Sequence, residues 1–99
     1  MAFPLTSGSG VKQRPALVLL DTGDQDIVVA RITSQPARTS FDIVLVEWHL
    51  AGLLRPSIVR VDKVATLEKR FIRRRLGILS TNDSASVCAA VHALWTSIK

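Results

Sequence analysis

The chain has a single cysteine, Cys88, among its 99 residues. One cysteine cannot form an internal disulfide, and a structural metal site of the C-x-x-C type is also excluded. A protein without disulfides suits a reducing compartment, so we expect it in the cytoplasm. The start, MAFPLTSGSG, lacks the basic region and apolar core of a signal peptide. No apolar run approaches the roughly 20 residues of a membrane span, so we expect no membrane association.

Acidic residues are also in short supply. Eight Asp and Glu stand against 13 Lys and Arg, which gives a net charge of +5 and a pI near 10.4. Such an excess in a short chain predicts a polyanionic partner, either a nucleic acid or an acidic protein segment. The apolar content of 47% is enough for one folded core, so we expect a single domain over residues 1–99.

Short apolar and β-branched segments fill the chain up to about residue 77. Pro15 begins the run PALVLL, and the turn cluster DTGDQD separates it from IVVARIT, so this pair predicts a β-hairpin. Further strands are expected at residues 41–48, 57–61 and 64–67, and a strand or bend at 70–77. The predicted strands at 57–61 and 64–67 would lie on either side of the polar pair Asp62–Lys63.

A helix is expected over residues 80–98. Ser80 fits the N-cap position of a capping box with Asp83 three residues later. An apolar stripe follows at helical spacing, formed by Val87, Val91, Leu94 and Ile98. The fold class is therefore mainly β with a C-terminal α-helix, and the many short strands favour a small barrel.

The segment SGSGVKQRP, residues 7–15, resembles a phosphate-binding loop in its Gly and Ser content. Such loops need GK[ST] and a following helix, whereas an apolar strand follows here. A nucleotide-binding loop is therefore excluded, and we expect a flexible loop that brings Lys12 and Arg14 to the mouth of a strand.

Four motifs occur in order along the chain: K-x-R-P at 12–15, I-T-S at 32–34, AGL-x-R-PS at 51–57 and R-x-D at 60–62. Together they resemble the MazF/PemK/Kid family, the toxins of type II toxin–antitoxin pairs. The resemblance implies an SH3-like barrel of the CcdB/Kid type and a homodimer. It also implies sequence-selective cleavage of single-stranded mRNA without metal or cofactor, and an antitoxin whose C-terminal segment is acidic and apolar.

The resemblance also implies site residues. Asp62 matches the proposed general base and Arg60 the general acid, while Arg14 and Thr33 complete the catalytic set. Cleavage through the 2′-hydroxyl needs a proton acceptor, a proton donor and cations for the charge that develops on the phosphorane. The RNA-binding candidates are Lys12, Ser34, Gln35, Arg38, Lys63 and Arg73.

Each of these residues has a structural alternative. Arg60 and Asp62 lie two apart on a strand, so they would share a face and form a weak surface pair. Thr33 and Ser34 at a strand end are typical turn-capping hydroxyls. The basic run at 69–75 is typical of a solvated edge strand protected from aggregation. Trp48 can lie in the core or stack on a base.

The N-terminus departs from the family pattern. Relatives place a strand before the FPxT segment, whereas this sequence starts at Met1, so residues 1–14 are expected to form a flexible loop and the first strand to be missing. The exposed barrel edge would then be covered by a dimer partner or by the Arg-rich segment. The loop also lacks the His or Glu of several relatives. An inactive relative that dimerises and binds an antitoxin, or a gyrase-poisoning toxin of the same fold, therefore stays open as an alternative.

Overall fold

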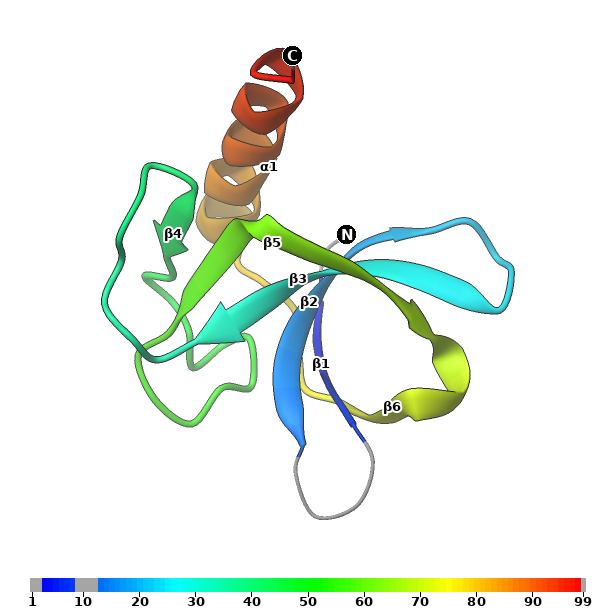
Figure 1. Ribbon diagram of the computed structural model, residues 1–99. Helices are drawn as coiled ribbons and strands as arrows, with labels where there is room; N and C mark the ends of the chain where they lie inside the picture. The colour runs from blue at the N-terminus through cyan, green and yellow to red at the C-terminus, as the bar shows by residue number, and fades with distance from the viewer. Residues whose placement is uncertain (1–2, 9–12, 99) are drawn as a thin grey trace.

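The computed structural model describes residues 3–8 and 13–98. These residues form six strands and one α-helix (Figure 1). In chain order the elements are β1 (Pro4–Ser7), β2 (Arg14–Asp21), β3 (Asp26–Thr33), β4 (Asp42–Val44), β5 (Ile58–Glu68), a short 3-10 helix η1 (Lys69–Phe71), β6 (Ile72–Arg75) and α1 (Thr81–Thr96).

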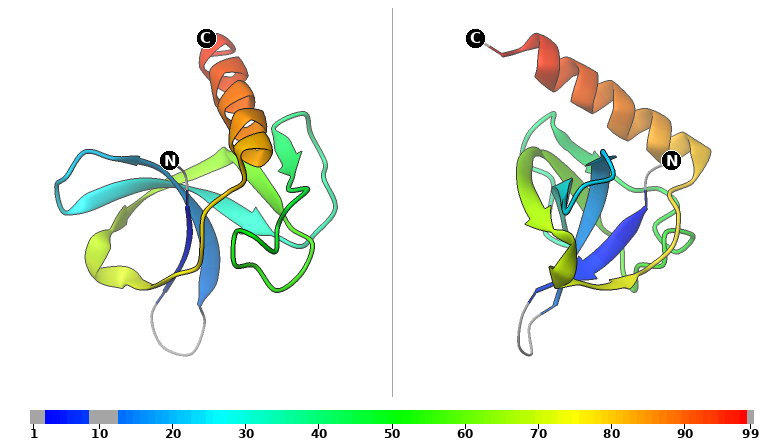
Figure 2. Two further views of the ribbon diagram at one scale, coloured as in Figure 1. Left: turned by 180° about the vertical axis from the view of Figure 1, so that it is seen from behind. Right: turned by 90° about the vertical axis from the view of Figure 1, so that its right-hand side faces the viewer.

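The strands form one antiparallel sheet in the order β4-β5-β3-β2-β1-β6. The sheet is strongly curled, and α1 rises from the end of it that holds β4 and β5 (Figures 1 and 2). Both faces of the central strands are covered by apolar side chains. The expected class, mainly β with a C-terminal helix, is confirmed.

The predicted hairpin is confirmed as β2 and β3. Its turn is built by two aspartates: Asp21 accepts a hydrogen bond from the N–H of Gly23 at 2.9 Å, and Asp24 accepts one from the N–H of Asp26 at 2.8 Å. Gly23 has a φ of 94°, which glycine adopts without a steric penalty.

Three strand predictions are wrong in their boundaries. Residues 58–61 and 64–67 belong to one strand, β5, which continues through Asp62–Lys63. The pairing with β3 shifts there, because Ala30 lies opposite Val64 while Arg31 lies opposite Arg60, so β5 bulges at this point and continues. The strand expected at 41–48 ends at Val44.

The segment after β4 turns because it forms local hydrogen bonds. The N–H of Leu50 donates to the carbonyl of Glu47 at 3.1 Å, and the N–H of Ala51 donates to that of Trp48 at 3.2 Å. The Trp48 ring is partly buried against the core, which favours its structural interpretation. The segment expected at 70–77 divides into η1 and β6.

The N-terminal prediction is wrong over Pro4–Ser7, which form β1 between β2 and β6. The flexible-loop prediction for the segment around Lys12 lies outside the described residues. The expectation that the Arg-rich segment covers a sheet edge is confirmed, because β6 pairs along β1.

Helix α1 begins as predicted. The Ser80 hydroxyl accepts a hydrogen bond from the N–H of Asp83 at 3.1 Å. The Asp83 carboxylate, which is 1% exposed, does not return to the cap. Instead it accepts hydrogen bonds from the N–H groups of Val46 and Glu47, both at 2.9 Å. Asp83 therefore ties the start of the helix to the segment after β4.

The second half of α1 extends away from the sheet (Figures 1 and 2). Val87 and Ala90 are buried, but Trp95 is 72% exposed and Ile98 is 66% exposed. The start of the predicted apolar stripe therefore packs on the core, whereas its last residue, Ile98, is exposed. No helix among residues 3–8 and 13–98 is long and apolar enough to cross a membrane.

Candidate functional site: an arginine-lined pocket

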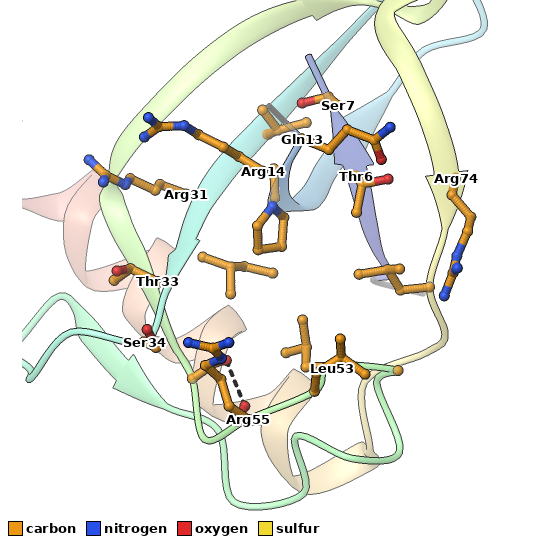
Figure 3. Close-up of a pocket in the computed structure, with 18 residues that line it drawn as sticks. Thr6, Ser7, Gln13, Arg14, Arg31, Thr33, Ser34, Leu53, Arg55 and Arg74 are labelled. Atoms are coloured by element: carbon orange, nitrogen blue, oxygen red, sulfur yellow. Dashed lines mark hydrogen bonds between the residues drawn. The ribbon is translucent and has the colours of Figure 1, made fainter. Parts of the chain in front are cut away.

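An open pocket of about 750 Å³ lies between strands β1–β3 and the segment 52–57, with β6 along one side (Figure 3). Four arginines line it: Arg14, Arg31, Arg55 and Arg74. Hydroxyl groups are interspersed among them, contributed by Thr6, Ser7, Thr33, Ser34 and Ser57. This set supplies many hydrogen-bond donors to an anionic ligand.

The floor and walls of the pocket are apolar. They are formed by side chains from four separate parts of the chain: Pro15 and Ala16, Val29 and Ile32, Leu53 and Leu54, and Leu76. An apolar surface ringed by cations matches a nucleotide, which combines a flat base with charged phosphates.

Strand pairing positions the two predicted catalytic residues that line this pocket. Arg14 opens β2 opposite Ser7 of β1, and Thr33 closes β3 opposite Ile58 of β5. The Thr33 hydroxyl oxygen accepts a hydrogen bond from the N–H of Gln35 at 3.2 Å, as a turn-capping hydroxyl does. Its hydrogen remains available to donate to a ligand, because a hydroxyl carries one donor besides its acceptor positions.

The positive charge of the pocket is not compensated within the described part of the chain. The ion pairs there join Arg60 to Asp42, Lys69 to Asp21 and Arg70 to Glu68, so none involves a pocket arginine. No Asp, Glu or His among residues 3–8 and 13–98 lines the pocket. The described residues also form no cluster of three or more His, Cys, Asp or Glu side chains suited to a metal ion.

Arg60 and Asp62 do not come together at this pocket. Arg60 is 2% exposed, and its Nη1 donates to Oδ2 of Asp42 at 2.6 Å, whereas Asp62 is exposed. The predicted weak surface pair between the two residues is wrong, because Arg60 is buried and pairs with Asp42.

The partner of Arg60 is a carboxylate held in its charged form. Burial raises the pKa of Asp42, but the N–H of Arg38, at 2.8 Å, and the charge of Arg60 outweigh burial, so the pKa lies below its ordinary value. Arg60 is therefore neutralised inside the fold. One of its donors, Nη2, is buried without a hydrogen-bond partner among the described residues.

The remaining RNA-binding candidates are divided. Ser34 lines the pocket. Gln35, Arg38 and Lys63 are exposed outside it, and Arg73 donates from Nε to the carbonyl of Gly8 at 3.0 Å. Lys12 lies outside the described residues.

The predicted site residues did not include Arg31, Arg55 or Arg74. Arg55 lies within the motif AGLLRPS, which was used only for the family resemblance. Arg31 interrupts the apolar segment IVVARIT, and a charge in the middle of a buried strand was the available signal. Arg74 lies one position from the predicted Arg73, on the opposite side of the strand.

The pocket wall contains a close contact between two backbone segments. Gly52 has a φ of 81°, and a Cβ there would lie 2.4 Å from the carbonyl oxygen of Leu76. A Cβ on Gly77 would lie 2.7 Å from the carbonyl carbon of Ala51. Glycine at both positions thus lets the segment 51–53, which carries Leu53 into the pocket, pack directly on the β6–α1 connection.

Residues 1–95 match the family described as PemK-like, MazF-like toxin of type II toxin-antitoxin system. The chain belongs to this family. Its pocket contains the Arg-Pro and I-T-S motifs that suggested the relationship, in Arg14, Pro15, Thr33 and Ser34. No curated protein matches the chain significantly.

Solved structures show the same fold at low sequence identity. An endoribonuclease in complex with its cognate antitoxin, from a mycobacterial species, has a TM-score of 0.79 and 16% identity, over 97% of this chain and 93% of that one. The Mycobacterium tuberculosis toxin MazF-mt6 has a TM-score of 0.78 and 21% identity, over 97% and 99%. The MazE–MazF structure from Deinococcus radiodurans has a TM-score of 0.78 and 22% identity, over 94% and 90%.

Proposed function

We propose that this toxin is an endoribonuclease that cleaves single-stranded mRNA at the arginine-lined pocket without a metal ion. The observation that carries the proposal is the gathering of Arg14, Thr33 and three further arginines around an apolar floor, with no carboxylate to neutralise them. Solved relatives of the same fold include proteins described as endoribonucleases.

In the proposed reaction, the 2′-oxygen of a ribose attacks the adjacent phosphorus, and the bond from phosphorus to the 5′-oxygen breaks. The proton of the 2′-hydroxyl leaves to a base, and the 5′-oxygen takes up a proton. The products are a 2′,3′-cyclic phosphate and a 5′-hydroxyl. The phosphorane carries one more negative charge than the substrate, which Arg14 and the hydroxyl of Thr33 stabilise.

The pocket favours Arg14 and Thr33 over the pair of Arg60 and Asp62. Arg60 is engaged by Asp42 inside the fold, and Asp62 is exposed outside the pocket. We therefore assign the rate enhancement to electrostatic stabilisation, and proton transfer to solvent water instead of Asp62.

The test is to incubate a long mRNA with purified protein in EDTA and to map the ends. We expect cyclic phosphate and 5′-hydroxyl ends, and a fall in rate of about 100- to 1,000-fold in Arg14→Met. Asp62→Asn is the matched comparison and should retain most of the activity. An equal fall in both variants would reassign the base to Asp62. RNA that stays intact under excess protein would exclude the activity and favour the non-catalytic alternative.

We also propose that an antitoxin silences the site. Two of the solved relatives are complexes with an antitoxin or with MazE. An acidic segment that pairs with the pocket arginines, with apolar side chains on Leu53 and Leu54, would exclude RNA from the same space. A synthetic acidic, leucine-containing peptide should compete with RNA; simultaneous binding of both would contradict this role.

We further propose that the toxin is a homodimer formed through α1. Residues 84–98 contain no charged side chain, yet Trp95 and Ile98 are largely exposed. A helix surface of that kind is unusual on a monomer. Sedimentation should show a dimer that Trp95→Asp dissociates. Leu20→Asp, at an exposed apolar residue of β2, is the control and should leave the dimer intact.

A further inference from the structure

Arg31 lies near the end of β3, and β3 pairs with β2, the strand that begins at Arg14. Its partner across β2 is Ala16, and Arg14 lies two residues before Ala16, on the same face of that strand. Both side chains project toward the same side of the pocket (Figure 3). The two guanidinium groups are therefore presented together by neighbouring strands.

On the other side of β3, where β5 pairs with it, the residue opposite Arg31 is an arginine. Arg31 lies opposite Arg60 of β5, which in turn lies opposite Asp42 of β4. Asp42 carries one negative charge, and its ion pair with Arg60, at 2.6 Å, balances the charge of Arg60 alone. Arg31 is thus the uncompensated cation of a row with two positive charges and one negative charge.

This arrangement is unfavourable for the folded chain alone. Like charges directly opposite each other on neighbouring strands destabilise a sheet. Arg31 is exposed and forms no ion pair within the described ranges, so no carboxylate there offsets this repulsion. A ligand anion at the pocket would supply the missing negative charge.

We propose that Arg31 is a phosphate-binding residue and that it binds the same RNA phosphate as Arg14. Two guanidinium groups on one phosphate offer several parallel N–H donors, which suits a group whose negative charge increases during cleavage. The inference rests on RNA as the ligand of the proposed function, and it adds a residue that lies outside the Arg-Pro and I-T-S motifs.

The binding test uses a single-stranded RNA with 2′-O-methyl groups, which the protein binds but cannot cleave. Arg31→Met is compared with Arg70→Met, which removes the same charge from an exposed residue that lies outside the pocket and pairs with Glu68. Arg31→Met should weaken binding at least tenfold and lower the slope of log K against log salt by about 0.7, the value for one phosphate contact on a single strand. Arg70→Met should leave the slope unchanged. Equal losses in both variants would overturn the proposal, as would the absence of binding by the parent.

Two further readouts separate this role from a structural one. The Arg31→Met and Arg14→Met losses should be non-additive, because both residues contact one phosphate, whereas additive losses would place them on different phosphates. Arg31→Met should also unfold at the same or a higher denaturant concentration than the parent, because it removes an unpaired positive charge opposite Arg60 in the strand register. A lower midpoint would show that Arg31 serves the fold.

The inference and the proposed function can fail separately. If the parent binds the 2′-O-methyl RNA but leaves natural RNA intact, cleavage is excluded and Arg31 is still tested by the salt dependence. If the parent cleaves RNA but Arg31→Met matches Arg70→Met in binding and rate, the role of Arg31 is excluded and the nuclease assignment stands.

Discussion

Arg60 and Arg31 face each other across β5 and β3, yet their surroundings are opposite. Arg60 is buried and paired with Asp42, whereas Arg31 is exposed at the mouth of the pocket without a partner among the described residues. On the buried side each charge is balanced because an unpaired charge there would be costly. On the pocket side the imbalance is tolerated by solvent and is available to a ligand. The same residue type thus serves the fold in one region and, in our proposal, RNA binding in the other.

Asp42→Asn should have the largest effect on stability. The change leaves the Arg60 guanidinium buried without a counter-charge, so we expect a loss of about 3–5 kcal/mol in the free energy of unfolding. Urea denaturation measures it. Asp62→Asn, at an exposed aspartate on the same strand pair, should leave stability nearly unchanged; equal effects would mean that the buried pair has no special weight.

A second change distorts the pocket side without touching any charge. Gly52→Ala places a Cβ about 2.4 Å from the Leu76 carbonyl at a φ of 81°, so we expect a loss of about 2–3 kcal/mol and a displaced Leu53 wall. Gly23→Ala is a matched control, since its φ is 94° but nothing lies within 4 Å of the added atom. It should lose about 1 kcal/mol. RNA binding should fall only in Gly52→Ala.

Acid should weaken the buried pair of Arg60 and Asp42 gradually, because it protonates Asp42. Because the pKa of Asp42 is lower in the folded state, its contribution to stability is full above its unfolded pKa of about 3.9 and is lost as the pH falls through the folded value. Stability measured against pH should therefore decline below about pH 4. The decline should be shallower in Asp42→Asn, and an identical slope in both proteins would assign it to other carboxylates.

The smallest change in stability is expected for a substitution in the pocket. Arg14→Met removes an exposed charge without an ion pair, so the free energy of unfolding should change by no more than about 0.5 kcal/mol while cleavage falls steeply. Thermal denaturation beside an RNA cleavage assay measures both quantities. A large loss of stability would show that Arg14 is structural, like Arg60.

Local signals predicted the elements that depend on neighbouring residues. The Asp- and Gly-rich turn defined the β2–β3 hairpin, and Ser80 defined the start of α1. The course of β5 was not predictable in this way, since its bulge is set by pairing with β3, far away in the sequence. The end of β4 was missed for a similar reason, because hydrogen bonds to Asp83 hold the segment that follows it.

The candidate site was predictable only as far as the family motifs reach. Those motifs led to Arg14, Thr33 and Ser34, which line the pocket. They also led to Arg60, whose burial depends on Asp42 and could not be inferred from the R-x-D spacing. Arg31 and Arg74 were missed because curling of the sheet, not sequence proximity, brings β3 and β6 to one cavity.

The carboxylate of Asp83 also has a kinetic consequence. It accepts hydrogen bonds from two backbone N–H groups of the segment after β4 while its own N–H is bound by Ser80. We therefore expect exchange of the Val46 and Glu47 amides with solvent to be coupled to opening of the first turn of α1. The segment 46–53, which carries a wall of the pocket, should then open together with the first turn of the helix. Any partner that holds α1 will slow the opening of that wall.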